Sequence, residues 1–476
     1  MKICLNFSAA LGLLFITSAL PAETTFMIQD DPTLDAIVAK VRQEYLATRA
    51  QNQPGFNKLD VAVLIPNDDG TWKRGSYGGE TLHYPASTVK LPFMAAAMYW
   101  ERTKNHPVGY LDAPVAPIIR VSDNVATGRV IDAITETTNH TTATLEPSYE
   151  SWRAARLFPR DYLTTRGLLG NQSTHNKTYP TNSGQGPNGF ETLLIKDHGR
   201  NMMQAKMSAS LMLEIIKGNL EPRSTQYMRG LLTHDKWGGH SVLGYGVPPG
   251  TIYENKSGCA YDTLADIAYI KMPGNDKEMF VAIYTDAYID TEPKQPDPYD
   301  VSVLGPFTEM LIEALNYHDG APPKIKRDNS NATHFSTTGT WTAETSDTEK
   351  MGTDYLYAKG GTGETSATWK LAVPEDGLYE ICVWYSQGAD RAKDAPFTVH
   401  HDGGTTVVLI DQQSKGGRWV RLGDFEIKAG QGSVSVTNAI ANPAQVVVAD
   451  GVKATKWPAG STSAIKSIDM NTTDTH

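Results

Sequence analysis

The sequence has 476 residues, a length that exceeds one ordinary compact core and predicts two domains. With 40% hydrophobic and 20% charged residues, its composition is that of a globular protein. The formal net charge of −10 argues against nucleic acid and against an anionic membrane surface as partners.

The N-terminus has the pattern of a secretory signal peptide. Lys2 precedes a mostly apolar stretch over residues 5–20, and Pro21-Ala22 then leads into a polar segment. The apolar stretch is short for a bilayer span, and no later segment is long and apolar enough for one. We therefore expect residues 1–22 to be cleaved from a secreted or periplasmic protein that has no transmembrane span.

The first domain is expected to span residues 23–318 and to mix helices with strands. Asp31-Pro32 predicts a helix start, because it combines a capping side chain with proline at the first helical position. The hydrophobic patterns then predict, in chain order, a helix over 34–45, strands over 61–65 and 71–77, helices over 87–100, 122–134 and 205–217, strands over 252–256, 265–272 and 279–287, and a closing helix over 307–314. Residues 136–189 are rich in Thr, Asn, Ser and Gly and are expected to be mostly loop, with local structure over 149–169. This order suits an α+β domain in which both ends of the chain share one sheet.

A linker is expected over 319–337, followed by an all-β sandwich over 338–457 and a disordered tail over 458–476. Glycine, adjacent prolines and basic residues mark the linker. Beyond it, turns separate short alternating strands, predicted over 367–373, 378–385, 397–401, 405–410, 419–422, 433–437 and 445–449. Signal cleavage would leave only Cys259 and Cys382, one in each domain, so no disulfide framework is expected.

Three short motifs follow one another in the first domain. They are Ser-x-x-Lys at 87–90, Ser-Asp-Asn at 122–124 and Lys-Ser-Gly at 256–258. On a helix, residues three apart share a face, so Lys90 lies beside Ser87. A serine hydroxyl needs a neighbouring base to become nucleophilic, and a buried lysine near other cations can supply one. The alternative, a capping serine with a surface lysine, fits poorly because residues 91–94 form an apolar run.

The trio and its flanks resemble the class A β-lactamases and related penicillin-recognising enzymes over residues 32–317. The resemblance implies that Ser87 attacks the substrate carbonyl, that Lys90 transfers protons and that Ser122 passes a proton to the leaving nitrogen. It implies an oxyanion hole formed by the backbone N–H groups of Ser87 and Cys259, with the Cys259 side chain a bystander. Asn124 would hold the substrate amide, and the third motif, Lys256-Ser257, would bind a substrate carboxylate.

Class A enzymes also carry a Glu-x-x-Leu-Asn loop that positions the deacylating water. The best match here is 191–195, in which Glu191 would be the catalytic base and Ile195 replaces the asparagine. Glu146 and Glu150 are alternative bases, and an ordinary surface glutamate is an alternative role for Glu191.

The arginine that often helps to bind the β-lactam carboxylate falls at Ala265, and Arg229 is a substitute from elsewhere in the chain. These departures leave two possibilities open: rapid acylation with slow deacylation, or a different amide or ester substrate.

The second domain resembles the golvesin C-terminal-like module, which is also found attached to polysaccharide lyases. The residues that carry the resemblance are Trp369, Gly-Leu-Tyr at 377–379, Trp384-Tyr385, the segment 395–401, Gly-Arg-Trp at 417–419 and Ala-Asp-Gly-Val at 449–452. The resemblance implies a β-sandwich attachment module with a polysaccharide ligand, against which exposed tryptophans would stack. Trp369 and Trp384 lie in predicted strands and are expected in the core instead.

Together these patterns predict an exported active-site-serine hydrolase that acts through an acyl-serine on β-lactam or peptidoglycan-like amide bonds and carries a carbohydrate- or envelope-binding module. One alternative is a D-amino-acid peptidase or esterase on the same fold, and another is a non-catalytic penicillin-recognising protein. No metal or other cofactor is expected, because the 12 histidines lack the paired spacings of a zinc site.

Overall fold

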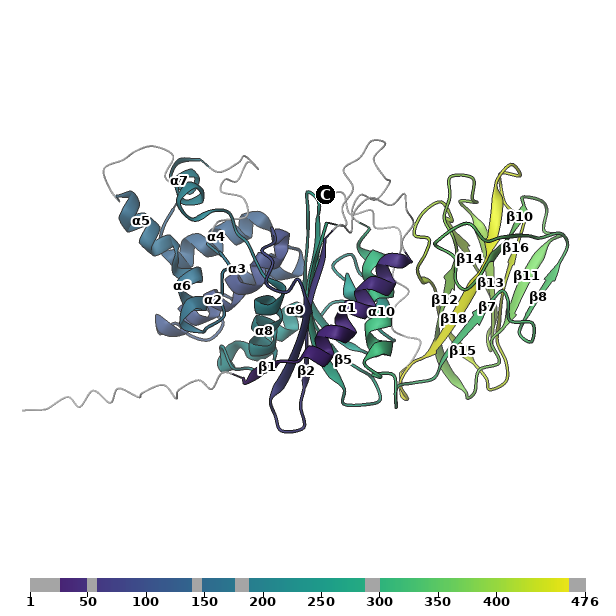
Figure 1. The fold of residues 1–476 in the computed structure, drawn as a ribbon, viewed down its shortest axis with the longest axis horizontal. Helices are drawn as coiled ribbons and strands as arrows, with labels where there is room; N and C mark the ends of the chain where they lie inside the picture. The colour runs from purple at the N-terminus through teal and green to yellow at the C-terminus, as the bar shows by residue number, and fades with distance from the viewer. Residues whose placement is uncertain (1–25, 49–57, 139–147, 176–187, 287–299, 462–476) are drawn as a thin grey trace, which may run out of the picture.

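The computed structural model describes residues 26–48, 58–138, 148–175, 188–286 and 300–461, and the chain forms two bodies joined by a short connection (Figure 1). The expected signal peptide at 1–22 lies outside the described residues, as does most of the expected tail. Within the ranges just given, none of the helices has both the length and the apolar character that crossing a membrane requires.

The first body is built on a six-stranded sheet with the order β1-β3-β2-β6-β5-β4. Its neighbours are antiparallel except for the parallel pair β1 and β3. The first three strands come from the start of the chain and the last three from after residue 250, so the expectation that both ends share one sheet is confirmed. The bounds are β1 (Ile28–Asp30), β2 (Leu59–Pro66), β3 (Trp72–Tyr77), β4 (Ile252–Ala260), β5 (Thr263–Lys271) and β6 (Glu278–Thr285).

Helices cover both faces of this sheet (Figure 1). Side chains alternate along β2, so Val61 and Val63 pack in one core with α1 and α10, while Ala62 and Leu64 pack in the other with α2 and α8. The helix bounds are α1 (Pro32–Ala47), α2 (Lys90–Thr103), α3 (Asp112–Arg120), α4 (Asn124–Thr135), α5 (Tyr149–Arg156), α6 (Phe158–Thr165), α7 (Gly189–His198), α8 (Ala205–Ile216), α9 (Thr225–Leu232) and α10 (Gly305–Ala314). Single 3-10 turns are η1 (Ala86–Val89), η2 (Pro222–Ser224), η3 (Leu243–Gly246) and η4 (Val301–Leu304).

Local sequence explains the ends of several elements. Asp31 caps α1 by accepting from the backbone N–H groups of Thr33 and Leu34, with Pro32 in the first turn as predicted. The segment expected as one helix over 87–100 begins instead with η1, and α2 starts only at Lys90. The local structure expected within the loop-rich region 136–189 is present, as the two helices α5 and α6 over residues 149–165. Both are eight residues long and mostly polar, which is too short to show a clear helical period.

The second body is an all-β domain, as expected. Its sheets have the orders β17-β10-β9, β14-β13-β16-β11-β8 and β15-β12-β18-β7. Trp369 is fully buried between them, as predicted for a core residue, and Trp384 is partly buried. The bounds are β7 (Lys324–Asp328), β8 (Phe335–Thr338), β9 (Thr342–Glu344), β10 (Tyr355–Lys359), β11 (Ser366–Lys370), β12 (Gly377–Trp384), β13 (Ala395–His401), β14 (Gly404–Ile410), β15 (Val420–Ile427), β16 (Ser433–Thr437), β17 (Val446–Ala449) and β18 (Gly451–Lys456).

The expectation of a linker over 319–337 has to be corrected. Strand β7 pairs antiparallel with β18 over residues 324–328, so the second domain begins before the expected residue 338. The basic residues that suggested a solvated linker have partners: Lys324 and Lys326 both bind Glu313 of α10. The connection between the domains is therefore short, and its charges belong to the contact between them.

Candidate active site

The serine of the first motif lies in a strained turn directly before α2. Ala86 has a φ of +45°, a region that residues other than glycine rarely adopt. The Ser87 side chain is half-buried, whereas Lys90, one turn later, is fully buried. This turn brings the Lys90 Nζ atom to 3.1 Å from the Ser87 Oγ atom. The first motif thus forms the serine–lysine contact that its spacing predicts.

The serine of the second motif reaches the same amine from the junction of α3 and α4. Ser122 has a φ of +56°, and Asp123 caps α4 by accepting from the Ala126 N–H group at 2.8 Å. The Lys90 amine donates to the Ser122 hydroxyl at 2.9 Å and also to the Ser122 carbonyl oxygen. These bonds hold the strained turn against Lys90, which also contacts Ser87.

The lysine of the third motif completes the cluster from β4. Lys256 is almost fully buried, and its amine donates to the Ser122 hydroxyl at 3.2 Å and to the Ser257 carbonyl at 2.7 Å. The Ser122 hydroxyl therefore lies between two lysine amines. The structure brings together Ser87, Lys90, Ser122 and Lys256 from three segments that are far apart in the sequence.

Protonating both of two buried amines that lie so close together costs free energy, because burial and the neighbouring positive charge each disfavour the charged form. Burial, assisted by the charge of Lys256, lowers the pKa of Lys90 to about 6, and the nearby Asp123 opposes this shift. Burial lowers the pKa of Lys256 to about 8, and the carboxylate of Asp266 opposes that shift. At neutral pH, Lys90 is therefore mostly uncharged and Lys256 mostly protonated. An uncharged amine beside a serine hydroxyl is able to accept its proton.

The glycine of the third motif lets β4 approach the nucleophile closely. A Cβ atom at Gly258 would lie 2.7 Å from the Pro85 carbonyl oxygen and 2.9 Å from the Ser87 backbone nitrogen. Only glycine fits at such a distance. The approach brings the backbone of 258–259 alongside the Ser87 amide, as an oxyanion hole shared by Ser87 and Cys259 requires.

The two expected substrate-binding side chains flank the cluster. Asn124 is the first residue of α4, and Ser257 follows Lys256 on β4. Both are half-buried, and neither side chain has a hydrogen-bond partner among the described residues.

The expected deacylating base lies in a different cluster. Glu191 of α7 is buried, with its Oε1 atom 3.1 Å from the Arg156 Nη2 atom of α5. The same Arg156 nitrogen donates to the Asp132 carboxylate of α4 at 2.9 Å. Of the two alternatives, Glu150 is exposed on α5, and Glu146 lies outside the described residues. Glu191 therefore joins α7 to α5 through an ion pair.

Neither position weighed for a substrate-binding arginine presents a free guanidinium. Ala265 is fully buried in β5. Arg229 of α9 donates through two of its nitrogens to the Glu254 carboxylate of β4, at distances between 2.8 and 3.2 Å. Lys256, by contrast, lies beside Ser122.

Sequence reasoning missed a buried polar group behind the third motif. Asp266 of β5 is fully buried and stands opposite Ser257 in the strand register. Its carboxylate accepts from the Leu243 backbone N–H at 3.0 Å, from the Asn255 amide at 2.8 Å and from the Tyr253 hydroxyl. The available signal was an aspartate inside the otherwise apolar strand segment 264–270.

Comparisons with known proteins agree with this arrangement. A model of the β-lactamase enzyme family matches residues 115–298, and a model of the golvesin C-terminal domain matches residues 325–456. Golvesin from Dictyostelium discoideum is 33% identical over 442 residues, which are 92% of this chain and 75% of golvesin. The chain belongs to the golvesin family. The expectation of a β-lactamase-like domain followed by a golvesin C-terminal domain is thereby confirmed.

Other relatives of this golvesin-family chain match only one part of it. Xanthan lyase from Bacillus sp. (strain GL1) is 35% identical over 134 residues, which are 28% of this chain and 14% of the lyase. The crystal structure of a β-lactamase from Sphaerobacter thermophilus covers 59% of this chain and 97% of its own, with 18% identity and a TM-score of 0.41.

Proposed function

We propose that this golvesin-family chain is an active-site-serine hydrolase that forms an acyl intermediate on Ser87. The observation that carries the proposal is the contact of 3.1 Å between the Ser87 hydroxyl and the Lys90 amine, whose pKa is lowered to about 6. A serine beside a mostly uncharged, buried amine is an activated nucleophile.

Each step of acylation has a group within reach. Lys90 accepts the proton of Ser87 as its oxygen bonds to the substrate carbonyl carbon, and the N–H groups of Ser87 and Cys259 stabilise the oxyanion. When the C–N bond breaks, the leaving nitrogen takes a proton from the Ser122 hydroxyl, which recovers one from Lys90 at 2.9 Å. Protonated Lys256, at 3.2 Å from the same hydroxyl, favours negative charge there.

The proposed substrates are β-lactams or peptidoglycan-like amides that carry a carboxylate. Lys256 supplies the positive charge for that carboxylate, and Ser257 and Asn124 supply hydrogen bonds. Because Arg229 is bound to Glu254, we assign carboxylate recognition to Lys256 among the described cations. This makes a D-amino-acid peptide or an ester the main alternative substrate for the same nucleophile.

Deacylation is proposed to be slow. The carboxylate of Glu191 is paired with the buried Arg156 guanidinium, and Ile195 cannot hydrogen-bond a water. We therefore assign Glu191 a structural role, and we expect the acyl-enzyme to persist long enough to be isolated.

Intact-mass spectrometry after incubation with a fluorescent penicillin tests the proposal. We expect a covalent adduct on the wild type and none on Ser87→Ala. Ser336→Ala, which removes an exposed hydroxyl on β8, is the matched control and should be labelled like the wild type. Turnover of the penicillin without an adduct, if it depends on Ser87, would indicate fast deacylation. If neither an adduct nor turnover is observed, β-lactams are excluded as substrates. The remaining interpretations are then a different amide or ester substrate, or a non-catalytic binding protein.

For the second domain we propose attachment to an envelope polysaccharide, with the whole protein exported. A cavity of about 450 Å³ lies where several strands of this domain end. Its lining includes the polar side chains of His334, Lys370 and His401. Co-sedimentation of the full chain with insoluble peptidoglycan and with cellulose tests the attachment. Recovery of the protein in neither pellet would argue for a protein ligand instead.

A further inference from the structure

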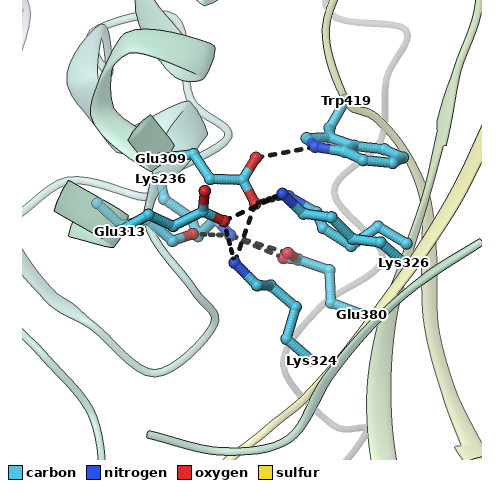
Figure 2. Close-up of polar contacts among 9 residues, drawn as sticks. Lys236, Glu309, Glu313, Lys324, Lys326, Glu380 and Trp419 are labelled. Carbon is cyan, nitrogen blue, oxygen red and sulfur yellow. Dashed lines mark hydrogen bonds and ion pairs between the residues drawn. The ribbon is translucent and has the colours of Figure 1, made fainter. Parts of the chain in front are cut away.

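The second domain contacts the segment of the first domain that leads into catalytic strand β4. This segment, residues 233–247, connects α9 with β4 and is called here the β4 approach loop. Its Lys236 amine donates to both carboxylate oxygens of Glu380 on β12, at 2.9 and 3.0 Å (Figure 2). The indole N–H group of Trp237 donates to the same carboxylate at 2.8 Å. The side chains of Lys236 and Glu380 are only 11% and 3% exposed, so this ion pair is shielded from water.

The same lysine also ties the two ends of the β4 approach loop together. Its amine donates to the Val247 carbonyl oxygen at 2.7 Å. Within the loop, the Trp237 ring packs edge-on against the Tyr245 ring with a centroid distance of 5.4 Å. Glu380 thus holds the two residues that cross-link the loop.

The other side of the β4 approach loop binds the support of the active site. The His240 carbonyl oxygen accepts from the Asn255 amide at 2.8 Å, and the Leu243 N–H group donates to the Asp266 carboxylate at 3.0 Å. Asn255 itself donates to Asp266 at 2.8 Å and directly precedes Lys256 in β4. Hydrogen bonds therefore join Glu380 to one side of the loop and join the other side to the backbone that carries Lys256, with the loop backbone connecting the two.

We propose that Glu380 of the second domain is a positioning residue for the active site, holding the β4 approach loop so that Asn255 and Asp266 keep Lys256 in place. The second domain is then a working part of the catalytic unit as well as an attachment module. This inference rests on the proposed role of the Ser87 cluster.

Docking of the two domains does not depend on Glu380 alone. Glu309 of α10 accepts from the Trp419 indole at 2.8 Å and pairs with Lys326 at 3.2 Å, and Glu313 pairs with Lys324 at 2.8 Å (Figure 2). In addition, Arg418 binds Asp300 and the Ser302 hydroxyl. These contacts remain when Glu380 is changed, so its variants are expected to stay docked.

The test compares Glu380→Ala and Glu380→Gln with a matched control in the full chain. Glutamine keeps an acceptor for Trp237 but loses the charge that Lys236 requires. Glu375→Gln is the control, because Glu375 pairs at 3.0 Å with Lys456 inside the second domain. Lys236→Met removes the same contact from the other side.

Hydrogen exchange of the β4 approach loop is the first readout. We expect the loop amides, that of Leu243 in particular, to exchange about tenfold faster in Glu380→Ala and Lys236→Met than in the wild type. Glu380→Gln should give a smaller increase, and Glu375→Gln none.

Penicillin labelling is the second readout. We expect acylation about tenfold slower in Glu380→Ala and less affected in Glu380→Gln. The acylation rate should fall at alkaline pH as Lys256 loses its proton, and this alkaline limb of the pH profile should move to lower pH in Glu380→Ala. The reason is that loss of the Leu243 hydrogen bond makes the Asp266 carboxylate easier to protonate, which removes negative charge beside Lys256. Three titratable groups face Lys256: Asp266 from β5, Lys90 from α2 and His234 from the β4 approach loop.

Several outcomes would overturn the inference. Loop exchange in both Glu380 variants equal to that in Glu375→Gln would do so. A lower melting temperature without any change in the alkaline limb would reduce Glu380 to a structural contact and would also overturn it. If the wild type is not labelled at all, the proposed hydrolase function fails, and the exchange comparison alone then decides whether Glu380 holds the loop.

Discussion

Two buried lysines share the hydroxyl of Ser122, and this sharing is the main electrostatic fact of the site. Each amine is stripped of water, so each prefers to be uncharged, and the charge of Lys256 further disfavours a proton on Lys90. The carboxylate of Asp266 raises the pKa of Lys256, so Lys256 keeps its proton to a higher pH than Lys90. At one pH the pair thus offers an uncharged amine, Lys90, and a protonated one, Lys256, as the proposed acylation of Ser87 requires.

This arrangement predicts a bell-shaped pH dependence for the acylation of Ser87. The rate should rise as the pH passes about 6, because Lys90 loses its proton and becomes a base, and should fall above about 8, because Lys256 loses its charge. Lys256→Arg should extend the plateau to higher pH, because arginine stays protonated. Stopped-flow labelling with a fluorescent penicillin between pH 5 and 10 measures both limbs. A rate that keeps rising to pH 10 would contradict the role given to Lys256.

A second prediction separates a structural from a catalytic Glu191. Glu191→Gln leaves the fully buried Arg156 with one fewer carboxylate, and we expect the free energy of unfolding to fall by about 3 kcal/mol. The lifetime of the acyl adduct should stay the same, because this carboxylate is held by the Arg156 guanidinium. Glu150→Gln, on the exposed side of α5, should change neither quantity. Urea denaturation and adduct decay measure the two effects, and a longer-lived adduct with unchanged stability would restore Glu191 as the base.

At the scale of elements, the sequence was sufficient for the strands and helices that carry the motifs, because their apolar patterns are long. Strands β4, β5 and β6 and helix α2 lie close to their predicted ranges. The short helices α5 and α7 were missed, since their buried faces are completed by residues distant in the chain, such as Trp152 against Phe190 at 5.5 Å. The ion pair of Glu191 belongs to the same junction, and the Glu-x-x-Leu pattern at 191–194 does not reveal this partner.

The close approach of β4 to η1 gives a prediction at this scale. Gly258→Ala would place a methyl group against the Ser87 backbone and force the strand away from the oxyanion hole, so we expect acylation to fall about 100-fold. The protein should remain folded, with a stability loss of about 1–3 kcal/mol. Gly230→Ala in α9 is the matched control, because an added Cβ there meets nothing within 4 Å. Normal acylation by Gly258→Ala would mean that the two backbones need not touch during the reaction.

At the scale of the whole molecule, the contact between the domains was beyond sequence reasoning. The sequence pattern assigns Lys324 and Lys326 to a linker, yet they lie on β7 and pair with Glu309 and Glu313 of α10 (Figure 2). Basic residues near a domain boundary look the same in a sequence whether they face water or an acidic helix. The pairing of β7 with β18 places these lysines in the second domain, where they contact the acidic residues of α10. The interface is rich in charge, so its strength should depend on pH.

Glu309 is the group at which that dependence should be measured. It is buried among Lys453, Lys326 and Lys324, whose charges hold the pKa of its carboxyl well below the usual value of 4.5. A lowered pKa contributes stability that is complete above about pH 4.5 and is lost as the pH falls toward the folded-state pKa. If the two domains unfold in separate steps, the step that separates them is the one to measure. Glu309→Gln should therefore lower the free energy of the first unfolding transition, in which the contact between the domains is lost, by about 3 kcal/mol at pH 7. That difference from the wild type should shrink steadily below pH 4.5, where the wild-type carboxylate begins to lose its advantage. Glu426→Gln, at an exposed position of β15, should match the wild type at every pH. Urea denaturation at pH 7, 4 and 3 measures the series, and a difference that does not change with pH would show that the charge of Glu309 does not hold the domains together.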